Sequence, residues 1–268
     1  MAAESARLKE WVDGLLAGGA VAVPTVEVLE SVDSTNRYLL ETAAAAGDVP
    51  RACLARSQTA GRGRRGRIWH ARPGASLALS LAWPIPHGRV PPSYPVGVGI
   101  GVVQALEGLG LEGVRLKWPN DLMVDGAKLG GILVEQRMPG PDRPGWLIVG
   151  IGINRESADT LGLERAVTDL ASHFPGGAPE WLELAARVIE RQCRLHPVLL
   201  REGIAPLEAE LERIDLLRGH AIEVLGDGAH ARALGIDPAS GCLVAVFDDG
   251  AVRHLHSGEV SVRGCEHG

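Results

Sequence analysis

Apolar and polar positions in the first 153 residues predict strands and helices in irregular alternation. Charged and apolar residues share the first sixteen positions at helical spacing, which predicts an amphipathic N-terminal helix. Short apolar runs bounded by glycine, proline or asparagine follow, as expected for strands. The predicted strands are residues 25–30, 52–56, 76–83, 113–117, 129–136 and 146–153, and the predicted helices are residues 37–46 and 96–109.

The pattern changes twice in the second half of the chain. Residues 161–217 carry apolar positions at helical spacing, most clearly over 180–200 and 205–214. Beyond Arg218, short apolar runs are separated by turn sequences such as Gly-Asp-Gly, which predicts a small β-barrel of about fifty residues. We therefore expect two domains, 1–217 and 218–268, with the barrel strands at 221–225, 229–234, 242–247, 251–256 and 259–262.

Composition narrows the class of protein. A chain of 268 residues with 46% hydrophobic and 22% charged residues is an ordinary globular chain. The net charge of −6 disfavours a general binder of nucleic acids or anionic membranes. Four scattered cysteines form no zinc motif or disulfide framework, and no signal peptide or membrane span is visible, so we expect a cytoplasmic protein. The cysteines are Cys53, Cys193, Cys242 and Cys265.

Lysine is scarce in this chain. Of 27 Lys and Arg residues only three are lysines, which leaves 27 − 3 = 24 arginines. Two of the three, Lys117 and Lys128, lie in one short segment. A lysine is a compact point charge, whereas an arginine is a planar fork. The pair therefore indicates a site where a small cation meets an anionic or polar ligand, unless both lysines persist by chance.

The segment from Gly61 to Gly66 matches the Gly-x-Gly-x-x-Gly pattern of dinucleotide-binding folds, but its context does not. That pattern should open a helix, and Pro73 and Gly74 follow too closely for one. We interpret the segment as a mobile anion-binding loop, with Trp69 as a stacking surface and arginines as phosphate or carboxylate ligands. An RNA-binding loop is the alternative. The arginines are Arg62, Arg64, Arg65 and Arg67.

The segment from Lys117 to Asp121 places a cation, an amide and a carboxylate within five positions. Asn120 and Asp121 could help to hold Mg²⁺ beside nucleotide phosphates, Asp121 could act as a general base, or both could be simple turn residues. A hairpin turn at Asp125-Gly126 would place Lys117 and Lys128 on adjacent strands. Gly130 and Gly131 would leave room for a ligand there.

Glycines alternate in Gly150-Ile-Gly-Ile-Asn154, which indicates one strand face with close packing or a bound ligand. His254 and His256 also share a strand face, but no further metal ligands are near in sequence. We expect a surface pair there.

Five motifs occur in the order and at the spacing of the biotin protein ligases, and the chain resembles that family. Any one motif is weak, but five in register are specific. The C-terminal Gly258-Glu-Val-Ser261 is also similar to the family's last domain. The five motifs are Ser34-Thr-Asn36, Gln58–Gly66, Lys117–Leu122, Lys128–Glu135 and Gly150–Asn154.

The resemblance implies an α+β fold, related to class II aminoacyl-tRNA synthetases and lipoate ligases, followed by an SH3-like barrel. It implies that biotin and MgATP give biotinyl-5′-AMP and pyrophosphate. A lysine on a biotin carboxyl carrier domain of acetyl-CoA carboxylase or a related enzyme would then displace AMP. ATP and Mg²⁺ are the implied co-substrate and ion, with no tightly bound prosthetic group.

The resemblance also assigns residues to substrates. The head group of biotin would meet residues from the first two motifs, Lys128 would meet its carboxylate and the developing charge, and Asp121 would orient or deprotonate the acceptor lysine. The implied biotin-binding residues are Ser34, Thr35, Asn36, Gln58, Gly61, Arg62, Gly63, Arg64, Lys128, Gly130 and Gly131. The implied adenylate residues are Arg62, Arg64, Arg65, Trp69, Lys117, Asn120 and Asn154, with Lys128, Arg64 and Asp121 as catalytic residues.

Some expectations limit the resemblance. Only 33 residues precede Ser34, too few for the winged helix-turn-helix of some family members, so no DNA binding is expected. The sequence leaves open whether the protein is a monomer or a homodimer. The segment from Gly61 to Gly66 and the following Arg67 are called the arginine loop below. A lipoate-type ligase and an RNA-binding protein that uses this loop remain the alternative functions.

Overall fold

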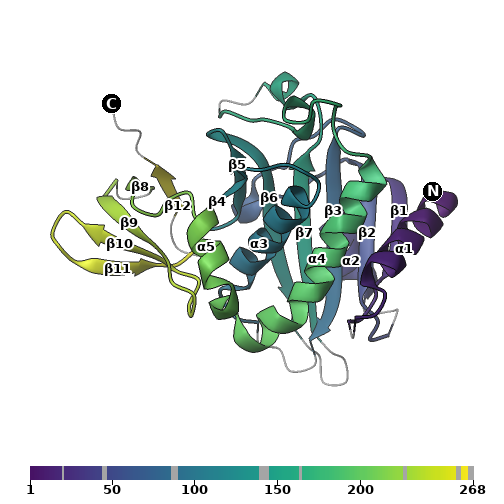
Figure 1. The fold of residues 1–268 in the computed structure, drawn as a ribbon, viewed down its shortest axis with the longest axis horizontal. Coiled ribbons are helices and arrows are strands. Elements are labelled where there is room, and N and C mark those ends of the chain that lie inside the picture. The colour runs from purple at the N-terminus through teal and green to yellow at the C-terminus, as the bar shows by residue number, and fades with distance from the viewer. Residues whose placement is uncertain are drawn as a thin grey trace.

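The computed structural model describes residues 1–19, 21–43, 47–85, 90–138, 145–162, 165–225, 228–257 and 261–264. Helices and strands are mixed along the chain, which makes the fold α+β (Figure 1). The main helices are α1 (Ala2–Leu16), α2 (Thr35–Thr42), α3 (Tyr94–Glu107), α4 (Trp181–Glu202) and α5 (Glu208–Ile214).

Seven strands form one mixed sheet in the order β1-β2-β3-β7-β6-β5-β4. The pair β1 and β2 is parallel, and all the other pairs in this sheet are antiparallel. The strands are β1 (Thr25–Val32), β2 (Arg51–Gln58), β3 (Ser76–Ile85), β4 (Arg115–Lys117), β5 (Asp121–Val124), β6 (Ala127–Arg137) and β7 (Gly145–Asn154).

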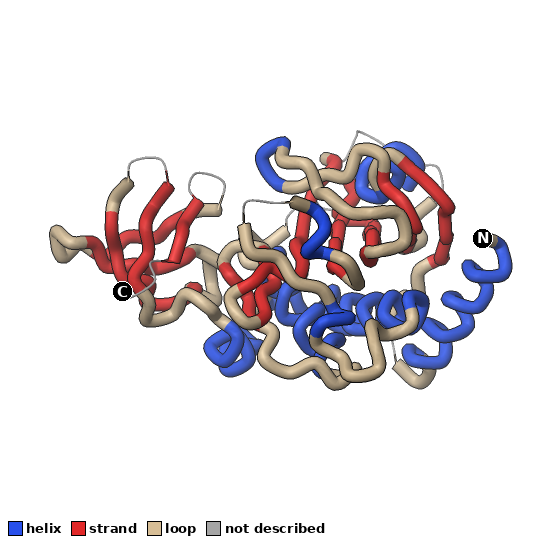
Figure 2. Tube along the Cα trace, turned by 90° about the horizontal axis from the view of Figure 1, so that it is seen from above, coloured by secondary structure: helices blue, strands red, loops and turns tan. Residues whose placement is uncertain are grey.

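The two faces of this sheet are covered differently. Leu77, Leu79 and Leu81 of β3 belong to the main core, which also contains buried residues of α1, α3 and α4. The residue Ala82 belongs to a smaller core with Leu39 of α2. Figure 2 shows long helices gathered below the strands, and loops with shorter helical segments above them. The face that α2 covers only in part is therefore where a cavity can form.

The main sheet departs from the sequence predictions most clearly at β3 and at β5. Strand β3 continues through Pro84 to Ile85, because pairing with β2 stops at Ala82 and Pro84 has only β7 beside it. The short strand β5 was not predicted. It separates β4 from β6, so Lys117 and Lys128 do not lie on adjacent strands as expected. A single hairpin was inferred where the chain makes two.

A second sheet is built from the C-terminal strands, in the order β11-β10-β9-β8-β12, and projects from the end of the molecule opposite α1 (Figures 1 and 2). It touches the first part of the chain where Trp118 Nε1 donates to the carbonyl of Gly241 at 3.0 Å. The strands are β8 (Ala221–Leu225), β9 (His230–Ile236), β10 (Leu243–Phe247), β11 (Val252–Leu255) and β12 (Ser261–Gly264).

The domain boundary at 217/218 and the closure of an SH3-like barrel stay predictions. Residues 44–46 of the predicted helix, residues 139–144 of the loop before β7, residues 258–260 of the last motif and Cys265 lie outside the described residues. The thiols of Cys53, Cys193 and Cys242 are buried and free, as core thiols should be. In the part of the chain that is described, no helix is long and apolar enough to cross a membrane.

A partly buried histidine connects α4 to the sheet. The ring of His196 stacks on Trp83 with centroids 4.3 Å apart, and its Nδ1 lies 2.7 Å from the hydroxyl of Tyr94. Burial lowers the pKa of His196 from 6.5 to about 4. The folded protein therefore holds this ring neutral where the unfolded chain would protonate it.

We expect this histidine to make stability depend on pH. The pKa of His196 is lower in the folded state than in the unfolded chain, so its contribution to the free energy of unfolding is fully present above the unfolded pKa. As the pH falls from 6.5 toward 4, up to about 3 kcal/mol of this free energy is lost. Urea unfolding at about pH 7 and about pH 5 should show a smaller loss in His196→Gln, which keeps a hydrogen-bonding group for Tyr94. Equal losses in both proteins would contradict the assignment.

Candidate active site

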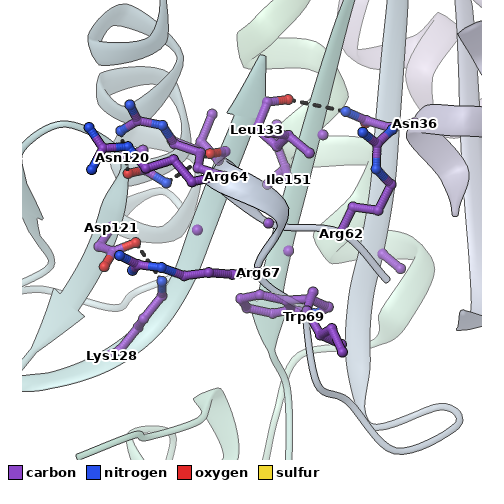
Figure 3. A pocket seen from close by; sticks show the side chains of 18 of the residues that line it. Asn36, Arg62, Arg64, Arg67, Trp69, Asn120, Asp121, Lys128, Leu133 and Ile151 are labelled. Atoms are coloured by element: carbon purple, nitrogen blue, oxygen red, sulfur yellow. Dashed lines mark hydrogen bonds and ion pairs between the residues drawn. The ribbon is translucent and has the colours of Figure 1, made fainter. Parts of the chain in front are cut away.

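A cavity of about 360 Å³ opens on the α2 face of the seven-stranded sheet. Its walls come mainly from the start of α2, the arginine loop, the turn between β4 and β5, and strands β6 and β7. Figure 3 shows Asn36 and Arg62 on one side, Asp121 and Lys128 on the other, and Trp69 between them. The sheet thus brings together motifs that are more than one hundred residues apart.

One wall of the cavity is lined by uncharged polar side chains that belong to a larger hydrogen-bond network. The backbone N–H of Thr35 donates to Gln58 Oε1 at 2.9 Å. Ser80 Oγ lies 2.7 Å from Thr35 Oγ1 and 2.6 Å from Asn36 Oδ1. Asn36 Nδ2 in turn donates to Glu135 Oε2 at 2.9 Å. Neither Ser80 nor Glu135 was predicted as a site residue, because each joins the site only through tertiary contacts.

The arginine loop is a small hairpin. The N–H of Trp69 donates to the carbonyl of Gly61 at 3.0 Å, and the N–H of Gly63 donates to that of Arg67 at 2.7 Å. The only helical turn between them is η2 (Arg64–Gly66), within which Arg65 has a left-handed φ of 55°. The loop therefore opens no helix, in agreement with the rejection of a dinucleotide-binding fold.

Two arginines of the loop are held at opposite ends of the cavity. Arg62 Nη2 pairs with Glu135 Oε1 at 3.0 Å, beside α2. Arg64 Nη1 donates to Asn120 Oδ1 at 3.1 Å, and its Nη2 donates to the carbonyl of Ser257 in the C-terminal part. Burial and the neighbouring Arg65 lower the pKa of Arg64. The loop is thus tied down at both sides.

The far wall of the cavity is built around a partly buried ion pair. Lys128 Nζ donates to Asp121 Oδ1, across the strand pair β5 and β6, and the lysine side chain is 11% exposed. Burial lowers the pKa of Lys128, while the charge of Asp121 opposes that shift. Lys117 also lines the cavity, although β5 separates it from Lys128. In Figure 3 Arg67 points toward Asp121 and Lys128.

Two of the alternating glycines let side chains approach the sheet closely. A Cβ on Gly150 would lie 2.3 Å from Asn36 Oδ1, and one on Gly152 would lie 2.8 Å from Trp69 Cε2. Gly150 therefore accommodates the polar wall, and Gly152 accommodates the tryptophan ring. Close packing, one of the two predicted explanations, accounts for both positions.

Most of the predicted site residues meet at the cavity, but three do not line it. Gly61 supports Trp69 instead, since a Cβ there would lie 2.7 Å from the carbonyl of Trp69. Gly130 packs against the backbone of Gly152, since a Cβ added at Gly130 would lie 2.6 Å from the carbonyl oxygen of Gly152. Asn154 is buried and donates to the carbonyl of Thr168 at 3.0 Å. The predicted residues in the lining are Ser34, Thr35, Asn36, Gln58, Arg62, Gly63, Arg64, Arg65, Trp69, Lys117, Asn120, Asp121, Lys128 and Gly131.

The cavity is strongly positive although the chain carries a net charge of −6. Among the described residues its lining holds one carboxylate, that of Asp121. The same lining contains seven cationic side chains, those of Arg62, Arg64, Arg65, Arg67, Lys117, Lys128 and Arg165. Phosphates and carboxylates are the ligands that such a lining attracts.

The predicted surface pair of histidines is not part of a metal cluster. Within the described ranges, no three His, Cys, Asp or Glu side chains gather as metal ligands. His256 Nδ1 instead lies 3.2 Å from Cys242 Sγ.

Fold and site together define a class of protein. An α+β domain holds a cavity with an uncharged polar wall at one end and clustered cations at the other. That arrangement suits an enzyme that joins a carboxylic acid to a nucleotide.

Comparisons with known proteins agree. Residues 28–154 match the Biotin/lipoate A/B protein ligase family. The bifunctional ligase/repressor BirA of Escherichia coli is 34% identical over 94% of this chain and 77% of its own length. A biotin–[acetyl-CoA-carboxylase] ligase of Paracoccus denitrificans is 34% identical over 72% of this chain and 94% of its own. The Aquifex aeolicus biotin protein ligase, solved with biotin and ATP, superposes with a TM-score of 0.73 at 27% identity, covering 90% of this chain and 99% of that one.

The chain belongs to the biotin protein ligase family. The predicted α+β fold is confirmed with it, and the comparisons favour a biotin ligase over a lipoate-type ligase or an RNA-binding protein.

Proposed function

We propose that this protein activates biotin as biotinyl-5′-AMP and transfers the biotinyl group to a carrier lysine. A biotin carboxylate oxygen attacks the α-phosphorus of ATP and pyrophosphate leaves. The neutral amine of the acceptor lysine then attacks the acyl carbon, AMP leaves with the electron pair of the broken C–O bond, and the amine loses its proton. The observation that carries this proposal is the two-ended cavity, polar beside α2 and cationic beside Lys128.

The polar end suits the biotin head group. Thr35, Asn36 and Gln58 carry hydrogen-bonding groups on a rigid wall, with Ser34 beside them. The cavity then leads to Lys128, whose point charge is placed to meet the carboxylate and the charge that develops on its oxygens. Gly131 keeps this approach open, because no side chain stands between its Cα and the lysine.

The cationic end suits the nucleotide. The guanidinium groups of Arg64 and Arg65 and the ammonium of Lys117 are placed to bind phosphates, and Asn120 positions Arg64. Arg62, held by Glu135 at the polar end, adds a further cation to the lining. Trp69 offers a ring for adenine, and among the described residues its Nε1 is buried with no hydrogen-bond partner.

Asp121 is the carboxylate of this site. Its Oδ1 is held by Lys128, which leaves Oδ2 able to orient or deprotonate the acceptor amine. Asn120 and Asp121 are hard oxygen donors, so they also fit a Mg²⁺ ion that takes its remaining ligands from phosphates and water. The ion would neutralise phosphate charge.

The acceptor follows from the family. Carboxylases that use biotin carry it on a lysine of a carrier domain, so we propose the carrier domain of acetyl-CoA carboxylase or a related enzyme as partner. We propose no DNA-binding activity, and a homodimer is an assembly to be tested by sedimentation.

Isotope exchange tests the proposed function. Labelled pyrophosphate should enter ATP only when biotin is present, because the first half-reaction is reversible. Lipoate should not replace biotin. Exchange that is independent of biotin, or that lipoate supports equally, would overturn the proposal.

Arg64→Ala should release the adenylate prematurely. The change removes the bonds that Arg64 makes to Asn120 and Ser257 and one cation near the phosphate. Loss of a charge-assisted hydrogen bond should speed escape of biotinyl-AMP about 10- to 100-fold. The measurement is filtration of enzyme charged with labelled biotin over time. Arg201→Ala, at an exposed arginine of α4, is the matched control and should retain the adenylate. Equal retention in both variants would contradict the role of Arg64.

A further inference from the structure

Ser80 is a buried hydroxyl at the centre of the polar wall. It is 0% exposed and does not line the cavity, so it is not placed to touch a ligand. Its oxygen nevertheless lies within hydrogen-bond distance of two residues that do, Thr35 at 2.7 Å and Asn36 at 2.6 Å. A hydroxyl has one hydrogen, so Ser80 can donate to only one of them.

The amide of Asn36 decides which one. Its NH₂ group faces two acceptors, Glu135 Oε2 at 2.9 Å and the carbonyl of Leu133 at 3.3 Å. A flipped amide would place its oxygen against a carboxylate and a carbonyl, neither of which can donate. Asn36 Oδ1 therefore faces Ser80, and it can only accept. The hydrogen of Ser80 goes to Asn36.

The direction of the next contact follows. With its hydrogen used, Ser80 Oγ must accept the hydrogen of Thr35 across their 2.7 Å contact, because otherwise two oxygens would meet with no hydrogen between them. Thr35 Oγ1 also lies 3.2 Å from Gln58 Oε1, a longer contact to an oxygen that already accepts the N–H of Thr35 at 2.9 Å. Thr35 thus donates to Ser80 and keeps its lone pairs.

We propose that Ser80, oriented by Asn36 and Glu135, is a positioning residue that makes Thr35 Oγ1 an acceptor toward the ligand and so selects a head group that donates N–H. Thr35 Oγ1 and Gln58 Oε1 then form a pair of neighbouring acceptors at the cavity wall. A ligand oxygen placed there would meet only lone pairs.

This selection rests on the proposed function and sharpens it. The fused ring of biotin contains a urea with two N–H donors, whereas the dithiolane ring of lipoate has none. Sites built to bond a ligand N–H reject analogues without it strongly, because their own polar groups are left unpaired. The direction of the buried hydrogen bond from Thr35 to Ser80 therefore lets the site discriminate between biotin and lipoate.

Binding calorimetry with two cyclic carbamates tests the proposal. Each carries oxygen in place of one ureido N–H of biotin. The wild-type protein should prefer biotin over at least one carbamate by about 100-fold or more. Ser80→Ala should reduce that preference at least about tenfold, since Thr35 loses the acceptor that fixes its hydrogen and can then donate that hydrogen to a ligand oxygen. Glu135→Gln should reduce it less, because the carbonyl of Leu133 still holds the Asn36 amide.

Two controls separate selection from folding and from loop closure. Ser76→Ala removes the same atom from a buried serine of the same strand and should leave the preference unchanged. Arg62→Ala breaks the other contact of Glu135 and should weaken biotin and carbamate equally. A biotin preference that survives intact in folded Ser80→Ala would overturn the inference. Failure of the wild-type protein to bind biotin would instead overturn the proposed function.

Discussion

Lys128→Arg is expected to lower the rate of biotin-dependent pyrophosphate exchange about 100-fold although the charge is kept. The lysine is buried, its Nζ contacts Asp121, and it lies 6.0 Å from the ring centroid of Trp69. A guanidinium is wider than an ammonium, so it would displace either the carboxylate or the ring. Steady-state exchange at saturating ATP measures the effect.

The matched control uses the lysine outside the site. Lys9→Arg makes the same change in α1, where the side chain is exposed and pairs with Asp13, and it should leave exchange unaltered. Wild-type exchange in Lys128→Arg would show that a point charge is not required at this position. Thermal unfolding of both variants guards against a loss caused by misfolding.

Gly150→Ala and Gly152→Ala are expected to damage different substrates, although the residues are two positions apart on one strand face. The first places a Cβ 2.3 Å from Asn36 Oδ1 and should raise the KM for biotin about 100-fold, by displacing the polar wall. The second places a Cβ 2.8 Å from Trp69 Cε2 and should raise the KM for ATP about tenfold or more. Exchange kinetics with each substrate varied in turn separate the effects.

Gly14→Ala is the control for both glycine variants. It lies in α1, where a Cβ added to the glycine would have nothing within 4 Å, so the extra bulk meets no neighbour. An equal rise of both KM values in each variant would contradict the division of the cavity into a biotin end and a nucleotide end.

Local sequence patterns were enough to predict most of the fold. Helical spacing placed α4 within two residues of its observed ends, and Gly-Asp-Gly and Asp-Asp-Gly turns located β8, β9, β10 and β11. The strand β5 was not predicted because it is four residues long and directly follows a turn. That omission caused the error in the relative placement of Lys117 and Lys128.

The site was predictable where motifs carry their own chemistry. Arg62, Arg64 and Lys128 stand in glycine-rich segments that indicate a ligand, and all three line the cavity. Ser80 has no such signal, since a serine in an apolar strand looks like any small residue. Its partner Asn36 is 44 positions away, and Asn36 meets Glu135 across 99 positions. Such links exist only once the sheet is formed.

The scarcity of lysine has a practical consequence for handling the protein. Primary amines are confined to the N-terminus, Lys9, Lys117 and Lys128, and the last of these is buried. Met1 and Lys9 both belong to the α1 end of the molecule, opposite the C-terminal sheet. Amine-reactive coupling to a sensor surface should therefore attach the protein mainly through α1, with the C-terminal sheet directed away from the surface and the immobilised molecules sharing one orientation.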